Sequence, residues 1–241
     1  MFVDCTEGVS GDMLLSAMIH ALPRDRRESA ISRLTKAAGM SGLTIHVVEV
    51  KDLDEAGLGI SYTRAEDQDH EVSYDEAFAT LGRFSEHLGS ASKLPGRILG
   101  LIFDAEAQAH NRPAERVHLH EIGRPHALFN MAAVGLLHSE LESLGAGEFV
   151  ASTIVTGKGI IVVSHGAVRV PAPASKILLK GLKSVPGDDP GERATPSGVA
   201  CVKALVSRQS DEPPTVYRSK GVGFGTKRFG GRLGRTTLLW A

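Results

Sequence analysis

The sequence lacks the features of disulfide-stabilised, secreted and membrane-spanning proteins. It has two cysteines, Cys5 and Cys201, which are too few for a disulfide framework. No apolar run approaches the length that crosses a bilayer, and the N-terminus "MFVDCTEG" shows no charged segment followed by an apolar one, as a secretion signal would. We therefore expect a soluble, cytoplasmic protein with no membrane partner.

The sequence also lacks a surplus of charge of one sign. Lysine and arginine together number 27 and aspartate and glutamate 28, so the net charge is -1. A protein that binds nucleic acid usually shows a basic excess, and here the basic stretch 220–235 is balanced by acidic stretches elsewhere. Nucleic acid is therefore not an expected partner.

Linkers and internal repeats are absent as well. No Pro/Ser-rich segment divides the 241 residues, and a hydrophobic fraction of 42% is ample for one core. We expect a single domain over residues 1–241. The one alternative is a subdomain seam near residue 145, where helical patterns give way to strand patterns.

Helical patterns dominate the first part of the chain. Ser10 is a suitable N-cap for a helix that begins near Asp12, Gly39 is typical of a helix end, and Pro125 suits a first helical position. The expected helices cover residues 12–19, 25–38, 74–88, 95–110, 125–144 and 197–207. The buried face of the helix after Pro125 should carry Val134, Leu137, Leu141 and Leu144.

Strand patterns dominate after residue 147. Earlier in the chain, only residues 2–5 and the alternating, β-branched stretch 43–50 read as strands, and the charged stretch 64–73 reads as a loop. Helices first and strands later are typical of α+β proteins rather than of a doubly wound sheet. The predicted fold class is α+β, with a helix-rich N-terminal half and a strand-rich C-terminal half around a mixed sheet.

The stretch "ERVHLHEIG" raises the first chemical hypothesis. In a strand, His118 and His120 would point to the same face because side chains alternate, and Glu121 follows directly. Two imidazoles beside a carboxylate suit a borderline metal ion. The same groups also suit acid–base catalysis, and a buried, hydrogen-bonded histidine pair would have no chemical role. From the residues alone, the three interpretations stay open.

Two further residues stand on the helix that follows. His126 and Asn130 are four positions apart and so share a face. His126 lies in the first turn, where backbone N–H groups favour anions and disfavour a positively charged imidazole. This face either extends the site of His118 and His120 or simply begins a helix.

Glycine-rich stretches supply weaker signals. In "DCTEGVSGDM", a strand, a loop and a helix follow one another, so Ser10 and Gly11 could present N–H groups to a phosphate or carboxylate. The Gly-Lys-Ser/Thr ending of a P-loop is missing. Asp4 and Asp12 could hold a cation or act as a base, and Asp12 could instead stabilise the helix dipole. "TGKG", with Lys158, and "GVGFGT" suit tight turns equally well, and His165 stands at the edge of a rigid corner.

Five stretches together resemble one family. "VDCTEGVSGDM", "VHLHEIG", "SHGAVRVPAPA", "ERATPSG" and "KGVGFGT" occur in the order and approximate spacing of the nickel-insertion proteins of LarC type. The resemblance covers essentially the whole chain. It implies CTP-dependent insertion of nickel into a pyridinium mononucleotide that bears two thiocarboxylates, with formation of carbon–metal and sulfur–metal bonds. The residues that match the family pattern are Asp4, Ser10, Gly11, Asp12, His118, His120, Glu121, Gly123, His165, Thr195 and Pro196.

The resemblance and the local chemistry together give a candidate site. The expected catalytic residues are His118, His120, Glu121, His126 and Asp12, and the expected metal ligands are His118, His120 and Glu121. The residues expected to contact a cofactor or substrate are Ser10, Gly11, Lys158, His165 and Thr195.

The chain departs from the family pattern in several places. His126 and Asn130 stand where the family usually carries aspartates, so groups that suit Mg²⁺ and Mn²⁺ are replaced by softer or neutral ones. Lys158 replaces a small residue, and a histidine-rich loop is reduced to "EDQDHE", with His70. The chain ends near the point where the family's C-terminal domain, which is associated with Mn-CTP binding, would begin. We therefore expect that CTP is not used by this chain alone and that a separate CTP-binding partner subunit supplies it.

Three functions compete at this point. The first is insertion or handling of nickel in a pyridinium-type pincer precursor, with a small-molecule substrate, bound nickel and a homo-oligomeric assembly. The second is a repurposed, metal-independent cyclase or lyase that uses His and Glu for acid–base catalysis on a small organic substrate, since no nucleophile with an adjacent base is evident. The third is a non-catalytic metal-binding or scaffold protein.

Overall fold

The computed structural model describes residues 1–64, 71–120, 122–163 and 166–241. The strands of its main sheet are β1 (Phe2–Asp4), β2 (Leu43–Asp52), β3 (Glu55–Arg64), β6 (Val150–Ala151), β13 (Arg208–Gln209), β14 (Ser219–Phe229) and β15 (Arg232–Trp240). They lie in the order β13-β6-β1-β15-β14-β3-β2. β1 is parallel to β6 and antiparallel to β15, so the sheet is mixed, and it joins strands from both sides of residue 145.

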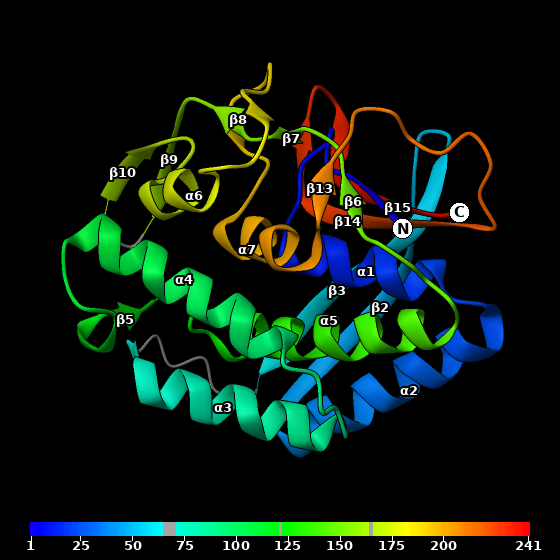
Figure 1. Ribbon diagram of the computed structural model, residues 1–241, viewed down its shortest axis with the longest axis horizontal. Helices are drawn as coiled ribbons and strands as arrows, with labels where there is room; N and C mark the ends of the chain where they lie inside the picture. The colour runs from blue at the N-terminus through cyan, green and yellow to red at the C-terminus, as the bar shows by residue number, and fades with distance from the viewer. Residues whose placement is uncertain (65–70, 121, 164–165) are drawn as a thin grey trace.

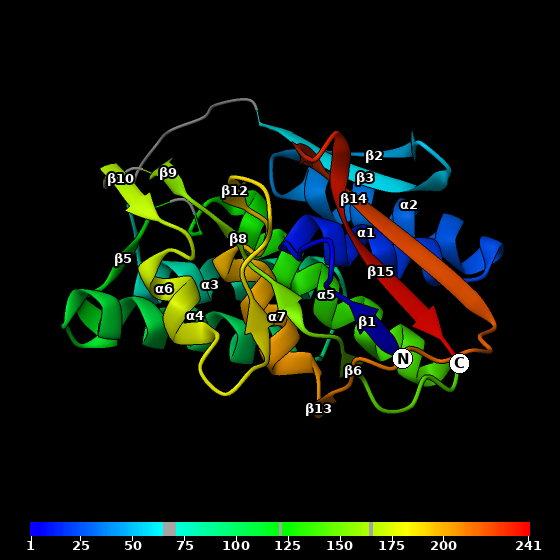
Figure 2. The same ribbon diagram turned by 90° about the horizontal axis from the view of Figure 1, so that it is seen from above.

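The helices stack against this sheet in layers (Figures 1 and 2). They are α1 (Gly11–Ala21), α2 (Arg24–Met40), α3 (Tyr74–His87), α4 (Leu94–His110), α5 (Pro125–Ser143), α6 (Pro173–Leu178) and α7 (Pro196–Leu205), with a short 3-10 helix at Ala114–Arg116. α1 lies directly on β14, β3 and β15, and α5 packs on α1. α3 and α4 pack on α5, farther from the sheet.

Two glycines of β14 allow α1 to lie this close to the sheet. A Cβ at Gly221 would stand 2.1 Å from the carbonyl oxygen of Ala17, and a Cβ at Gly223 would stand 1.8 Å from that of Met13. Any side chain at either position would therefore push the helix away. The stretch "GVGFGT" is thus part of a strand against which α1 packs, and its interpretation as a tight turn is wrong.

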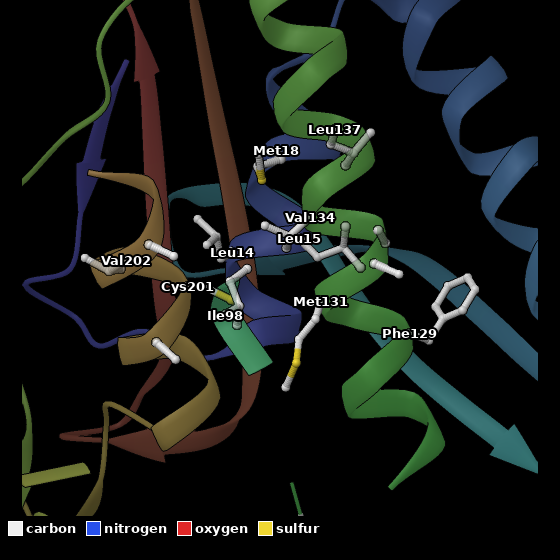
Figure 3. Packing of buried hydrophobic residues seen from close by; sticks show 14 of the residues in the cluster. Leu14, Leu15, Met18, Ile98, Phe129, Met131, Val134, Leu137, Cys201 and Val202 are labelled. Carbon is white, nitrogen blue, oxygen red and sulfur yellow. The ribbon is translucent and has the colours of Figure 1, made fainter. Parts of the chain in front are cut away.

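The core lies between α1, α5, α4 and α7. Figure 3 shows side chains of α1 (Leu14, Leu15 and Met18) in one cluster with side chains of α5 (Met131, Val134 and Leu137), with Leu14 on the side of α1 toward α7. Ile98 of α4 and Cys201 of α7 close the same cluster, and all of these side chains are fully or nearly fully buried. Each large apolar side chain buried in this way contributes roughly 1.5–3 kcal/mol. The N-terminal end of α5 is thereby held firmly in place.

Short strand pairs complete the region beside the N-terminal ends of these helices. β4 (Val72–Ser73) pairs with β5 (His118–Leu119), and β9 (Ile160–Val163) pairs with β10 (Gly166–Arg169). β8 (Gly157–Lys158) pairs with β12 (Gly191–Glu192), and β7 (Ile154–Val155) pairs with β11 (Ser184–Val185). Each pair forms a two-stranded sheet of its own, separate from the main sheet.

The α+β prediction is confirmed, together with the expected helices and the strands at both ends of the chain. The helix end at Gly39 is wrong: α2 continues to Met40, and the chain turns at Gly42, whose φ of 71° suits glycine. Leu144 caps α5 and is half-buried rather than fully buried. β3 has no counterpart in the predicted elements, and most of the charged loop 64–73 lies outside the described residues. Among the described helices, none is long and apolar enough to cross a bilayer.

Candidate functional site

A cavity of about 610 Å³ lies where the N-terminal ends of α1, α5 and α7 meet β3, β5 and the β9–β10 hairpin. Helix N-termini carry a partial positive charge and backbone N–H groups without intrahelical partners. Three such ends around one cavity favour a ligand that is at least partly anionic. Lys227 of β14 also lines the cavity.

The ends of α1 and α7 are joined through the segment before α1. The N–H of Val9 donates to the carbonyl of Arg193 over 2.9 Å, and the N–H of Thr195 donates back to the carbonyl of Val9 over 3.0 Å. Gly198 fits against this segment because a Cβ there would stand only 2.4 Å from the carbonyl oxygen of Val9. Gly8, with a φ of 105°, allows the preceding turn. Residues far apart in sequence therefore form one wall.

Side-chain caps fix the two helix ends. The hydroxyl of Ser10 accepts a hydrogen bond from the N–H of Met13, and that of Thr195 accepts one from the N–H of Gly198. The expected roles of Ser10 and Thr195 as ligand contacts are untested, but both residues line the cavity. Both hydroxyls are therefore engaged in the hydrogen bonds that cap the helices.

A group of polar side chains in the wall of the cavity comes from β3 and α5. The hydroxyl of Tyr62 donates to Oδ1 of Asn130 over 2.6 Å, and the ring of Tyr62 stacks on that of His126, with centroids 5.8 Å apart. Burial, and then the negative charge of Asp12, raise the pKa of the Tyr62 phenol. Tyr62 therefore stays protonated and acts as a donor, which fixes the orientation of the Asn130 amide.

The opposite wall carries two histidine–carboxylate pairs. His120 Nε2 lies 3.4 Å from Glu71 Oε1, and His110 Nε2 lies 3.5 Å from Glu106 Oε2, one helical turn before it. His118 and His120 flank the buried Leu119, as the expected alternation requires, although β5 itself ends at Leu119. Both histidines line the cavity.

The structure brings together most of the expected site residues but not all of them. Those that line the cavity are Ser10, Gly11, Asp12, His118, His120, His126, Asn130, Thr195 and Pro196. Lys158 instead lines a second cavity of about 360 Å³, with Lys176 and Lys180. Glu121, His165 and His70 lie outside the described residues. The described part of the chain contains no cluster of three His, Cys, Asp or Glu arranged for a metal ion, and the ligand set His118, His120 and Glu121 stays a prediction.

Several residues of the cavity were not predicted. They are Tyr62, Glu106, His110, Glu192, Ser197 and Lys227. Tyr62 was missed because β3 was missed. His110 and Glu106 carried a signal that could have been used, since a histidine four residues after a glutamate at a helix end is a recognisable pair.

Comparisons with known proteins lead to the same family that the sequence motifs resemble. The family model described as nickel insertion protein matches residues 1–236. A protein of Geotalea daltonii, provisionally named a nickel insertion protein, is 33% identical over 95% of this chain. The pyridinium-3,5-bisthiocarboxylic acid mononucleotide nickel insertion protein of Staphylococcus epidermidis is 29% identical, also over 95% of the chain. The alignments span 57% and 56% of these two relatives. No solved structure matches.

Proposed function

Because the chain belongs to the nickel insertion protein family, we propose that its cavity binds a pyridinium mononucleotide with thiocarboxylate groups and that the histidines of its wall deliver nickel to that substrate. The name of the Staphylococcus epidermidis relative supplies the substrate. The observation that carries the proposal is the arrangement of the cavity, which has His118, His120 and His126 on its walls and three helix N-termini around it. Nickel is cargo in this reaction.

The chemistry follows from ligand preference. Neutral imidazole nitrogen suits Ni²⁺, whereas soft sulfur ligands hold a late transition metal more firmly than water or hard oxygen does. His118 and His120 would present the ion, and the two thiocarboxylates of the substrate would take it over. Formation of a carbon–metal bond breaks a ring C–H bond: the electron pair passes to nickel and the proton to a base. His126 is our candidate for this base because its ring is held against Tyr62 at the cavity wall.

Partner and cofactor use are part of the same proposal. The chain spans little more than half of the length of the relatives that it matches. We propose that CTP is not turned over by this chain alone, because His126 and Asn130 stand where the family pattern has aspartates that suit Mg²⁺ or Mn²⁺, and that a separate subunit binds CTP. Incubation of the purified chain with CTP should release neither CMP nor pyrophosphate, and release of both would contradict this part.

One observation favours the alternative of a metal-independent acid–base enzyme. The pairs His120–Glu71 and His110–Glu106 resemble the histidine–carboxylate pairs that move protons in enzymes. Under this alternative, the same histidines would act on a small organic substrate without any metal. Metal binding separates the two functions.

The test is calorimetric titration of Ni²⁺ into protein purified without a histidine tag. We expect binding by the native chain and at least a tenfold weaker affinity, about 1.4 kcal/mol, after His118→Ala with His120→Ala. His46→Ala is the matched control, because His46 is exposed on β2 and contacts Thr63 rather than the cavity. Absence of nickel binding by the native chain would leave the metal-independent enzyme as the better explanation, and full binding by the double variant would contradict the assignment of His118 and His120 as the nickel-presenting residues.

A further inference from the structure

One end of the cavity presents hydrogen-bond donors without acceptors. Gly11 and Asp12 begin α1, and Ser197 is the second residue of α7; none of their backbone N–H groups has an acceptor among the hydrogen bonds of the described residues. Met13 and Gly198, the next donors along each helix, are already satisfied by the two caps. The unpaired donors therefore belong to neighbouring residues on two helices that are held together by Val9.

The amide of Asn130 adds a buried donor to the same place. Asn130 is 6% exposed, and its Oδ1 is occupied by the hydroxyl of Tyr62. In the described part of the chain, its Nδ2 has no acceptor, and Nδ2 is not among the fully buried atoms that lack a partner, so it reaches the cavity that Asn130 lines. An amide nitrogen in this position takes its acceptor from water or from a ligand in the cavity. This side chain is independent of the helix ends and indicates that an acceptor belongs here.

Gly11 leaves the space that such an acceptor needs. A Cβ built on Gly11 would stand 3.6 Å from Oγ of Ser197 and 3.8 Å from Nδ2 of Asn130. These are ordinary van der Waals distances, so alanine would fit the folded chain. The methyl group would nevertheless occupy the space between the donors of α1, α7 and α5.

We propose that this end of the cavity, formed by Gly11, Ser197 and Asn130, binds the phosphate monoester of the mononucleotide substrate. The proposal rests on the proposed function for the identity of the substrate. A phosphate monoester offers three terminal oxygens and close to two negative charges, which match several converging N–H groups. The thiocarboxylates are less suited to this end because they must reach the nickel that the histidines hold. The phosphate thus places the pyridinium ring toward His118 and His120.

The substitution Gly11→Ala gives a sharp test, with Gly100→Ala in α4 as its control because a Cβ at Gly100 meets nothing within 4 Å. The probes are nicotinic acid mononucleotide and nicotinic acid riboside, which differ only in the phosphate, each titrated without metal. The native chain and the control should bind the mononucleotide at least about tenfold more tightly than the riboside. Gly11→Ala should reduce mononucleotide binding to the level of the riboside without lowering the thermal midpoint, since alanine favours a helix.

A second variant tests the amide itself. Asn130→Ala removes the donor without adding a charge and should weaken the discrimination between the two probes. Equal binding of both probes by the native chain, or undiminished mononucleotide binding by Gly11→Ala, would overturn the proposal. Nickel titration without nucleotide reports on the proposed function separately: phosphate discrimination without nickel binding would retain the subsite and remove the nickel function, and the reverse result would remove the subsite alone.

Discussion

Tyr62 and Asn130 lie 68 positions apart in sequence and meet through a 2.6 Å hydrogen bond in the wall of the cavity. This contact joins a strand of the main sheet to the N-terminal end of α5, and it decides which side of the Asn130 amide faces the ligand. The ring of the same tyrosine supports His126. One side chain therefore positions the group that we assign to phosphate binding and the group that we assign to proton transfer.

Removal of the Tyr62 hydroxyl should lower affinity and stability together. In Tyr62→Phe, Oδ1 of Asn130 loses its donor and the amide is no longer held in one orientation. We expect roughly threefold to tenfold weaker binding of nicotinic acid mononucleotide and a loss of about 1–3 kcal/mol in the free energy of unfolding. Calorimetry and chemical denaturation measure the two effects. Tyr217→Phe, at an exposed tyrosine, should change neither, and an unaltered affinity in Tyr62→Phe would contradict the positioning role.

Separation of α1 from α7 should disrupt the site without any change to a side chain that faces the ligand. In Gly198→Ala the new Cβ would overlap the carbonyl oxygen of Val9 and stand 2.6 Å from Cα of Ser10. Because backbone atoms must move, we expect a loss of about 1–3 kcal/mol in stability, seen as a lower thermal midpoint. Gly82→Ala in α3 is the control, since a Cβ there meets nothing within 4 Å. A stable Gly198→Ala variant with native affinity would show that the two helix ends need not touch.

The charge of Asp12 should oppose the phosphate. Its carboxylate lies near enough to Tyr62 to raise the pKa of that phenol, and therefore stands close to the proposed subsite. Asp12→Asn should bind nicotinic acid mononucleotide roughly threefold to tenfold more tightly at low salt, with a smaller gain at high salt. Titrations at two ionic strengths measure this change. Weaker binding after neutralisation would mean that Asp12 contacts the ligand through a cation instead.

His20 should make stability depend on pH. The N–H of Val222 donates to Nδ1 of His20 over 3.0 Å, so the ring is an acceptor and neutral. Burial first, and then the positive charge of Arg27, lower the pKa of His20; the negative charge of Glu49 opposes them, and Lys220 adds a smaller lowering effect. The unfolded chain therefore takes up a proton below about pH 6.5 that the folded chain resists. The contribution of His20 to the free energy of unfolding is therefore fully present above about pH 6.5 and is lost as the pH falls below it.

The substitution His20→Asn keeps an acceptor near the position of Nδ1 and removes the titration. Denaturant unfolding at pH 7.5 and pH 5 should show a smaller loss of stability in His20→Asn than in the native chain. His46→Asn, at an exposed histidine, should retain the native pH dependence. An identical dependence in His20→Asn and the native chain would exclude His20 as the source.

The elements that the sequence predicted well are those with local signals. α1 follows from the cap at Ser10 and the apolar spacing behind it, and the N-terminal end of α5 follows from Pro125. The wall of the cavity depends on non-local contacts instead. Pairing of β3 with β14, which brings Tyr62 to the site, leaves no trace within either strand. Glycine is ambiguous for the same reason: Gly223 makes room for a distant helix, although the residues around it would also suit a turn.

The packing of α1 on β14 also constrains the order in which the chain can fold. The helix that begins the cavity comes from the first residues of the chain, yet the glycines that receive it belong to β14, Ser219–Phe229. Contacts of such long sequence separation form late, after most of the chain entropy has been lost. During synthesis, nearly two hundred residues must follow α1 before β14, the strand on which it packs, is made. A nascent chain therefore cannot complete the cavity that we assign to substrate and nickel until β14 has left the ribosome.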